Sequence, residues 1–272
     1  MTTNERDVAR CWDDNADTWT ALSRAGYDVY RDGLNTPAFL AMLPDVRGLH
    51  TLDIGCGEGH NTRLLAARGA HVTALDVSRA FIAHATAAER HEPLGVRYMH
   101  ASALALPVRD ESFDAATAFM SMMDVPDAAR AFVEAHRVLR AGGFLQMSIE
   151  HPCFSTPHRR NLRTRDGRTY AFEIGRYFER LEGGISEWTF SAAPPEVRAG
   201  AAPFRIPRFT RPLAEWLNLL VDAGFTIERC EEPRPTEAAV ARYPRLQDAQ
   251  VVAYFLHVRA RKPWPTHGTA PP

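Results

Sequence analysis

One stretch decides the fold of this 272-residue chain: Leu52-Asp53-Ile54-Gly55-Cys56-Gly57-Glu58-Gly59. The short apolar run before Gly55 is typical of a buried parallel strand. Glycines permit positive φ angles, so the backbone can approach a ligand closely. A second apolar run ends at Asp76, where an acidic residue can bind the two ribose hydroxyls of a nucleoside. The layout therefore predicts a nucleoside-binding crevice.

The loop itself separates the two classes of cofactor that fit this layout. Dinucleotide enzymes need G-x-G-x-x-G, with a pyrophosphate at the helix N-terminus. Here the pattern is G-x-G-x-G, and His60 follows it. Asp53 and Glu58 flank the loop and would repel a pyrophosphate by roughly 1 kcal/mol each at a few Å in a wet site. S-adenosylmethionine, which has an ammonium, a sulfonium and an adenosine but no phosphate, is favoured.

Residues 51–150 resemble the core of class I S-adenosylmethionine-dependent methyltransferases of the small-molecule type. Five segments in the family's order carry the resemblance: Asp53-Ile54-Gly55-Cys56-Gly57-Glu58-Gly59, Asp76-Val77-Ser78, Ser102-Ala103-Leu104-Ala105-Leu106-Pro107, Ser112-Phe113-Asp114 and Arg137-Val138-Leu139-Arg140-Ala141-Gly142-Gly143. One glycine loop is a weak signal, but five ordered segments are a strong one. The resemblance implies S-adenosyl-L-methionine as cofactor and in-line transfer of its methyl group to a small-molecule acceptor.

The resemblance also implies which residues contact the cofactor. They lie in the glycine loop, at the ends of the strands that follow and in the N-terminal segment: Asp53, Gly55, Cys56, Gly57, Asp76, Val77, Ser102, Ala103, Phe119 and Tyr30. Tyr27 and Arg31 are further candidates for contact with the carboxylate or the sulfonium. The family usually has an Asp at position 102, where it bonds the adenine amino group. Ser102 is expected to accept that hydrogen bond without the charge.

Strands alternate with helices, which predicts an α/β fold with right-handed crossovers. We expect a Rossmann-like, seven-stranded, mostly parallel sheet with helices on both faces and a C-terminal antiparallel hairpin. The chain divides into an N-terminal helical cap, a methyltransferase core, an insertion and a tail expected to be disordered: 1–45, 46–150 plus 211–262, 151–210 and 263–272, respectively.

The insertion 151–210 is rich in aromatic and arginine side chains. Two strands are expected within it, at 169–181 and 185–190, around Gly183-Gly184. The insertion leaves the sheet at the carboxyl end of the fifth strand, and ligands of open α/β sheets bind above those ends. A lid or substrate region is therefore expected. The alternatives are a structural hairpin away from the site or a dimer contact.

Methyl transfer from a sulfonium mainly requires alignment of the acceptor and exclusion of water. A hydroxyl or carbon acid would also benefit from a general base. Two candidates follow strand ends, His151 after the fifth strand and Asp124 after the fourth. The imidazole titrates near neutral pH. The alternative interpretations are a hydrogen-bonded turn histidine and a helix-capping aspartate.

Composition limits the choice of partners. The net charge of −1 gives no electrostatic footprint for nucleic acid. The four cysteines are scattered without a C-x-x-C pair, so no metal site is expected. No signal peptide and no apolar run of about eighteen residues is recognised, which predicts a cytoplasmic protein without membrane contact. A homodimer stays open.

Two other classes of function also stay open. An NAD(P)-dependent oxidoreductase shares the layout, although the third glycine of its motif is missing. A non-catalytic cofactor-binding or scaffold protein would keep the loop and Asp76 without turnover. Neither the acceptor molecule nor the acceptor atom is indicated. The insertion fits a flat, apolar or carboxylate-bearing molecule.

Overall fold

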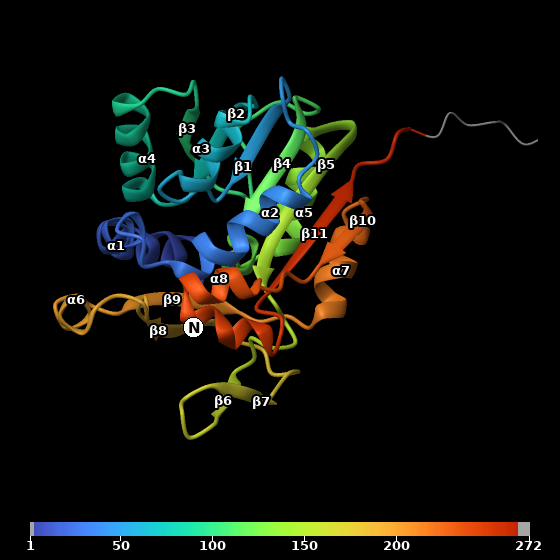
Figure 1. Ribbon diagram of the computed structural model, residues 1–272. Helices are drawn as coiled ribbons and strands as arrows, with labels where there is room; N and C mark the ends of the chain where they lie inside the picture. The colour runs from blue at the N-terminus through green and yellow to red at the C-terminus, as the bar shows by residue number, and fades with distance from the viewer. Residues whose placement is uncertain (1–2, 266–272) are drawn as a thin grey trace, which may run out of the picture.

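The computed structural model describes residues 3–265, and a seven-stranded sheet forms its centre (Figure 1). The strands lie in the order β10-β11-β5-β4-β1-β2-β3. Their bounds are β1 His50–Ile54, β2 His71–Asp76, β3 Arg97–His100, β4 Phe113–Phe119, β5 Leu139–Glu150, β10 Thr226–Glu231 and β11 Phe255–Arg261. Only β11 runs antiparallel to its neighbours in this sheet, β5 and β10. The predicted Rossmann-like sheet with a C-terminal antiparallel hairpin is confirmed.

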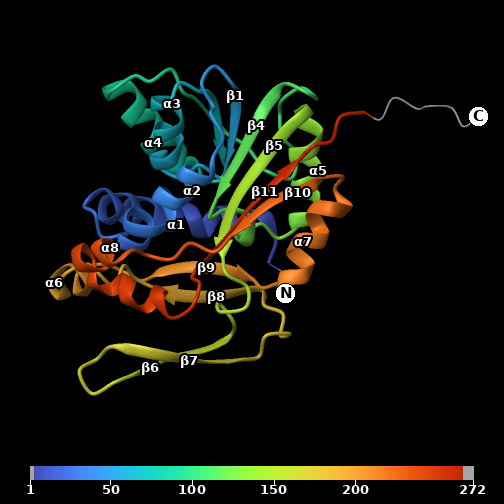
Figure 2. The same cartoon turned by 45° about the vertical axis from the view of Figure 1, so that its right-hand side comes forward.

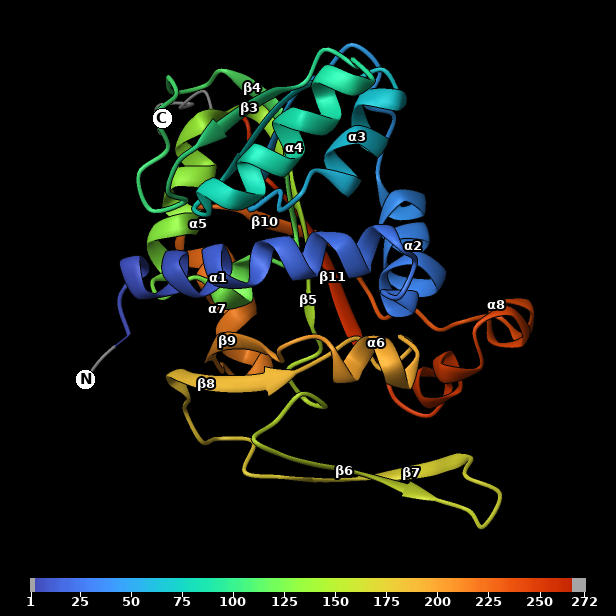
Figure 3. The ribbon, with the colours of Figure 1, turned by 90° about the vertical axis from the view of Figure 1, so that its left-hand side faces the viewer.

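Helices cover both faces of this sheet, as Figure 3 shows with the sheet seen nearly edge-on. The helices are α1 Glu5–Arg24, α2 Thr36–Met42, α3 His60–Ala67, α4 Arg79–His91, α5 Ala128–Val138, α6 Pro195–Ala199, α7 Leu213–Asp222 and α8 Glu237–Arg242. On one face, Phe132 of α5 and Trp216 of α7 belong to the larger apolar core. On the other face, Leu65 of α3 packs with residues of β2.

Side-chain caps position the helices that border the crevice. Ser78 accepts a hydrogen bond from the backbone N–H of Phe81 and caps the start of α4, a position that serine favours. Asp127 caps α5 in the same way. Residues 3–265 also contain three short helical turns: a π-helical turn at Arg31–Asn35 and 3₁₀ turns at Met122–Asp124 and Pro244–Gln250. The tail predicted for 263–272 lies, from residue 266 on, outside the described residues.

The insertion forms two hairpins, and the strand pairing expected around Gly183-Gly184 is wrong. β6 His158–Arg163 pairs with β7 Thr169–Gly175, and β8 Glu182–Trp188 pairs with β9 Phe204–Phe209. The glycines lie inside β8, where the register shifts between Glu182 and Gly184. They therefore form a bulge, and glycine in a strand interior often marks one.

Both hairpins lie beyond the carboxyl ends of the parallel strands, with β8–β9 nearer to the sheet than β6–β7 (Figures 1 and 2). Helix α1 crosses this end of the molecule and packs between α4 and β9 (Figure 3). Trp19 of α1 meets Phe190 and Phe204 of the insertion at ring-centroid distances of 4.9 and 4.8 Å. The N-terminal cap and the insertion thus share an aromatic contact above the sheet.

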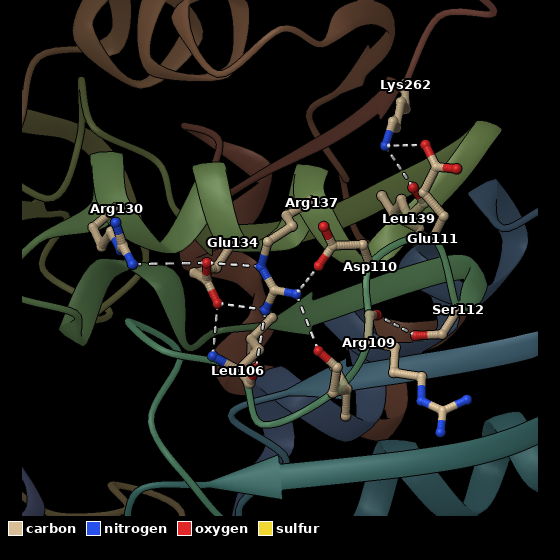
Figure 4. Close-up of polar contacts among 11 residues, drawn as sticks. Leu106, Arg109, Asp110, Glu111, Ser112, Arg130, Glu134, Arg137, Leu139 and Lys262 are labelled. Atoms are coloured by element: carbon tan, nitrogen blue, oxygen red, sulfur yellow. Dashed lines mark hydrogen bonds and ion pairs between the residues drawn. The ribbon is translucent and has the colours of Figure 1, made fainter.

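A polar network ties the loop after β3 to helix α5 (Figure 4). The buried carboxylate of Glu134 accepts hydrogen bonds from the backbone N–H of Leu106 at 2.8 Å and from Nη2 of Arg137 at 2.7 Å. Arg137 also donates to the carbonyls of Leu106 and Val108. The loop that carries Ser102 and Ala103 is therefore bonded to α5 through both N–H and carbonyl groups of its backbone.

We expect Glu134→Ala to lower the free energy of unfolding by about 2 kcal/mol, because it leaves buried donors without an acceptor. The hydrogen bond from Arg137 holds the pKa of Glu134 below its usual value. That stabilisation is present above the unfolded-state pKa and is lost as the pH falls through the folded-state pKa. Urea unfolding at neutral and at acid pH measures this. The free energies of unfolding of the variant and the unmodified protein should differ less at acid pH than at neutral pH.

Glu187→Ala is the matched control for this variant. Glu187 forms an exposed ion pair with Arg205, and such pairs contribute at most about 1 kcal/mol. A loss for Glu134→Ala no larger than for Glu187→Ala would contradict the role given to the network.

Candidate cofactor and acceptor site

A cavity of about 530 Å³ lies where the carboxyl ends of β1, β2 and β4 meet α1 and the insertion. Cavities that bury small-molecule ligands range from about 300 to 1,000 Å³. The cap contributes aromatic, aliphatic and polar side chains to its lining, among them Trp12, Trp19, Tyr27, Tyr30 and Arg31. The insertion contributes aromatic and polar ones: Ser155, Arg159, Trp188, Phe190, Ile206 and Arg208. The core contributes the glycine loop and the carboxyl ends of β1, β2, β4 and β5.

Two glycines of the loop are required by its geometry. Gly55 has a φ of +74°, and a Cβ added there would lie 2.3 Å from Cβ of Ser121. Gly57 has a φ of +55°, and a Cβ there would meet no protein atom within 4 Å. Both residues line the cavity. The first glycine therefore allows close packing on the neighbouring strand end, and the second leaves room for a ligand against the backbone.

Asp76 closes the end of β2, as predicted. Its carboxylate accepts hydrogen bonds from the backbone N–H groups of Gly57 and Ser78, both at 2.8 Å. The side chain is buried at the cavity wall, and burial raises the pKa of Asp76 to about 6 despite these two bonds. A carboxylate held in this way can still accept hydrogen bonds from ribose hydroxyls when it is ionised.

Asp53 also faces the cavity, but its carboxylate already joins three elements of the core. One oxygen accepts from the hydroxyl of Thr62 in α3 at 2.6 Å, and the other from Thr117 in β4 at 2.7 Å. Burial raises the pKa of Asp53, while these two bonds oppose the change. Each carboxylate oxygen keeps further acceptor capacity. Its contact with the cofactor, a prediction from the sequence, is compatible with this arrangement.

The charge argument from the sequence needs one correction. Glu58 does not present a bare carboxylate to the loop, because Arg24 donates to it at 2.9 Å and Arg31 lies 3.5 Å away. Nε of Arg31 also donates to Asp32 at 2.7 Å. The electrostatic argument against a pyrophosphate therefore weakens at Glu58. The cavity wall instead carries an ion-pair cluster in which Arg31 provides positive charge.

The structure brings together most of the residues that the resemblance implied. Nine of them line the cavity, from the glycine loop, the end of β2, the loop after β3, the end of β4 and the cap: Asp53, Gly55, Cys56, Gly57, Asp76, Val77, Ala103, Phe119 and Tyr30. Tyr30 stacks on Tyr254, and its hydroxyl donates to the carbonyl of Arg245, so its ring rather than its hydroxyl is free to meet a ligand.

Two candidates from the sequence do not line the cavity. The hydroxyl of Ser102 donates to the carboxylate of Glu5 and accepts from the N–H of Leu104. Contrary to the expectation, Ser102 does not line the cavity. His151 is buried beside the cavity rather than in it. Its Nε2 pairs with Glu232 at 2.7 Å, and its Nδ1 accepts from the N–H of Cys153. Both ring nitrogens are thus occupied, as in the turn histidine of the alternative interpretation.

Asp124, the other candidate base, does reach the cavity. Its carboxyl group is buried at the cavity wall and forms no hydrogen bond with any side chain or backbone group of residues 3–265. Burial raises the pKa of Asp124 well above its usual value. Arg208 opposes that shift, but its guanidinium is bonded to Glu150 at 2.6 Å and to Ser155 at 2.8 Å.

Comparison with known proteins identifies the family. The family model described as "Methyltransferase domain" matches residues 52–147. A solved S-adenosylmethionine-dependent methyltransferase from Mesorhizobium loti is 32% identical, with a TM-score of 0.66, and the match covers 83% of this chain and 96% of that one. This chain belongs to the S-adenosylmethionine-dependent methyltransferases.

Two curated methyltransferases are similar over a shorter span. The malonyl-[acyl-carrier protein] O-methyltransferase of Pectobacterium atrosepticum is 34% identical, and the match covers 46% of this chain and 49% of the relative. O-methyltransferase cnsE of Penicillium expansum is 33% identical, covering 56% and 62%. The chain thus spans about half to three-fifths of the length of these relatives.

The cavity fits the methyl donor of this family. Asp76 supplies an acceptor for ribose hydroxyls, and the open space at Gly57 admits the ligand against the backbone. Asp53 offers acceptor capacity for an ammonium group. Arg31 also lines the cavity, although its guanidinium is already bonded within the cap. In the described part of the chain, no three metal-ligating side chains cluster. No helix within residues 3–265 has the length and apolar character needed to cross a membrane.

Sequence reasoning missed the contributions of Glu5 and Arg208 to the lining, while Arg159 belongs to the arginine-rich insertion for which a carboxylate-bearing ligand is expected. They come from the cap and the insertion, which carry no motif. Arg159 lies over the ring of Tyr254, 4.3 Å from its centroid, and within residues 3–265 it forms no ion pair. Only their common position in the fold brings these residues to the cavity.

The raised pKa of Asp76 predicts a pH-dependent affinity for S-adenosylhomocysteine. Because ribose hydroxyls bind the ionised carboxylate, affinity should fall as the pH drops through about 6, by about tenfold per pH unit well below that value. Asp76→Asn should weaken binding throughout and abolish this pH dependence, whereas Asp14→Asn, an exposed change in α1, should not. Isothermal titration calorimetry between pH 5 and 7.5 measures this. An affinity of the unmodified protein that stays constant over this range would contradict the assignment.

Proposed function

We propose that this chain transfers the methyl group of S-adenosylmethionine to a small-molecule acceptor bound between the cap and the insertion. One observation carries the proposal. The same cavity is lined by the proposed cofactor residues around Asp76, by Asp124 and by several aromatic side chains. Donor and acceptor can therefore share one enclosed space, which is what alignment and exclusion of water require.

We propose that residues 151–210 are the substrate region. Trp188 and Phe190 lie on the cavity side of the β8–β9 unit and pack with Trp19 of the cap. Arg208 adds a guanidinium beside them. An apolar wall with a few polar groups suits a small organic molecule. The cytoplasmic location and the homodimer considered from the sequence stay predictions.

We propose transfer to oxygen. The two curated relatives described above are both named O-methyltransferases. S-adenosylmethionine supplies an activated methyl group on a sulfonium. A hydroxyl acceptor must lose a proton, and Asp124 is a carboxyl group in the cavity without a protein hydrogen-bond donor. Asp124 is therefore proposed as the group that removes this proton, in place of His151.

Incubation with methyl-labelled S-adenosylmethionine and a panel of phenols, quinols and carboxylic acids tests the function. We expect labelled product and an equal amount of S-adenosylhomocysteine with at least one member of the panel. Binding of S-adenosylhomocysteine without transfer to any of them would favour the non-catalytic alternative. Binding of NADH in its place would favour the oxidoreductase.

With an acceptor in hand, Asp124→Asn tests the proposed base. We expect kcat to fall by about 100-fold or more, because general-base catalysis contributes on that order. Since burial raises the pKa of Asp124, kcat of the unmodified enzyme should rise with pH as the carboxyl ionises, and the variant should lose this rise. His151→Gln is the control and should keep both kcat and its pH profile. The opposite pattern for these two variants would restore His151 as the base.

A further inference from the structure

Glu5 is a carboxylate of the N-terminal cap that lines the cavity beside the loop after β3, where it is bonded to Ser102. Val77 follows Asp76 and Ala103 follows Ser102, and both line the same cavity, as does Val8 of α1. A base attached to a ribose held by Asp76 would lie here, since the base extends beyond the ribose. Glu5, in the first turn of α1, lines this same space.

Ser102 and Glu5 are joined by a hydrogen bond in which the serine hydroxyl is the donor. Ser102 also accepts from the N–H of Leu104 at 2.9 Å. Its hydroxyl group is therefore engaged on both sides, and Ser102 itself does not line the cavity. The bond reaches only Oε1 of Glu5. No group among residues 3–265 donates to Oε2, which keeps its full acceptor capacity.

Hydrogen bonds of α1 and of the loop after β3 fix the position of Glu5. Asn4 caps α1 by accepting from the N–H groups of Arg6 and Asp7. Farther along the helix, Asp13 accepts from the hydroxyl of Ser78 at 2.7 Å. The loop that carries Ser102 is itself held to α5 by the Glu134 network. The carboxylate is thus placed by the fold before any ligand arrives, and preorganised acceptors bind with less loss of entropy.

We propose that Glu5 accepts the hydrogen bond from the 6-amino group of adenine in S-adenosylmethionine, and that Ser102 is its positioning residue. The inference rests on the proposed use of this cofactor. It places the acceptor for the base in the N-terminal cap, 97 residues from the serine that holds it. The cap then recognises the cofactor as well as covering it, and loss of helix α1 removes base recognition together with cover.

Calorimetry with two ligands tests this assignment. One is S-adenosylhomocysteine, and the other is its analogue with hydrogen in place of the purine 6-amino group. The unmodified protein should bind the analogue about tenfold or more less tightly, because it loses a hydrogen bond to a charged acceptor. In Glu5→Ala this ratio of Kd values should fall to about threefold or less. Asp14→Ala, an exposed acid-to-Ala change in the same helix, should keep the ratio of the unmodified protein.

A rescue variant separates recognition from folding. Glu5→Ala combined with Ser102→Asp returns a carboxylate to the same end of the cavity, so the ratio should rise again. If Glu5 only docks α1, Glu5→Ala weakens both ligands by the same factor and leaves the ratio unchanged, which overturns the inference alone. Failure of the unmodified protein to bind S-adenosylhomocysteine overturns the proposed function and the inference with it.

Discussion

The hydrogen bond from the backbone N–H of Gly57 to the carboxylate of Asp76 is the interaction on which the site depends. It joins the turn after β1 to the end of β2, and it requires a backbone conformation that glycine adopts readily. The bond also lowers the cost of burying a carboxylate at the cavity wall. Even so, burial raises the pKa of Asp76 to about 6, so a modest fall in pH below neutrality protonates the carboxylate. The protein thus keeps a costly charge where a ribose can use it.

The N-terminal cap and the core together form the walls of the cavity. The parallel strands bring Asp53, Asp76 and Asp124 to one edge of the sheet, because their carboxyl ends all meet there. Without a cover, this edge would be open to water. Helix α1 covers it and packs through Trp19 against the insertion. Since methyl transfer depends on alignment and exclusion of water, we propose that the cap and the insertion contribute to the chemistry by covering the cavity.

Local sequence predicted the parts of this structure that local chemistry determines. The turn at Gly55 and the strand that ends at Asp76 follow from residue types and spacing alone, and both are confirmed. The pairing in the insertion could not be predicted in the same way. Gly183 is equally suited to a turn or to a bulge, and only the partner strand β9 decides between them.

The partners of Ser102 and His151 also depend on contacts that spacing does not reveal. Glu5 is 97 positions from Ser102, and Glu232 is 81 positions from His151. Each partner approaches only after the sheet has assembled. Position at a strand end is therefore visible in the sequence, while the direction of the side chain is set by tertiary packing. For the same reason, the sequence does not reveal Glu5 and Arg208 as lining residues, because they lie on elements without a motif.

A crystal structure of the complex with S-adenosylhomocysteine tests the central claim most directly. The account predicts the ribose hydroxyls on Asp76, the base between Val77 and Ala103, and the sulfur directed toward the space that Asp124 and the insertion enclose. A ligand whose sulfur points away from that space, or whose ribose does not meet Asp76, would contradict the account.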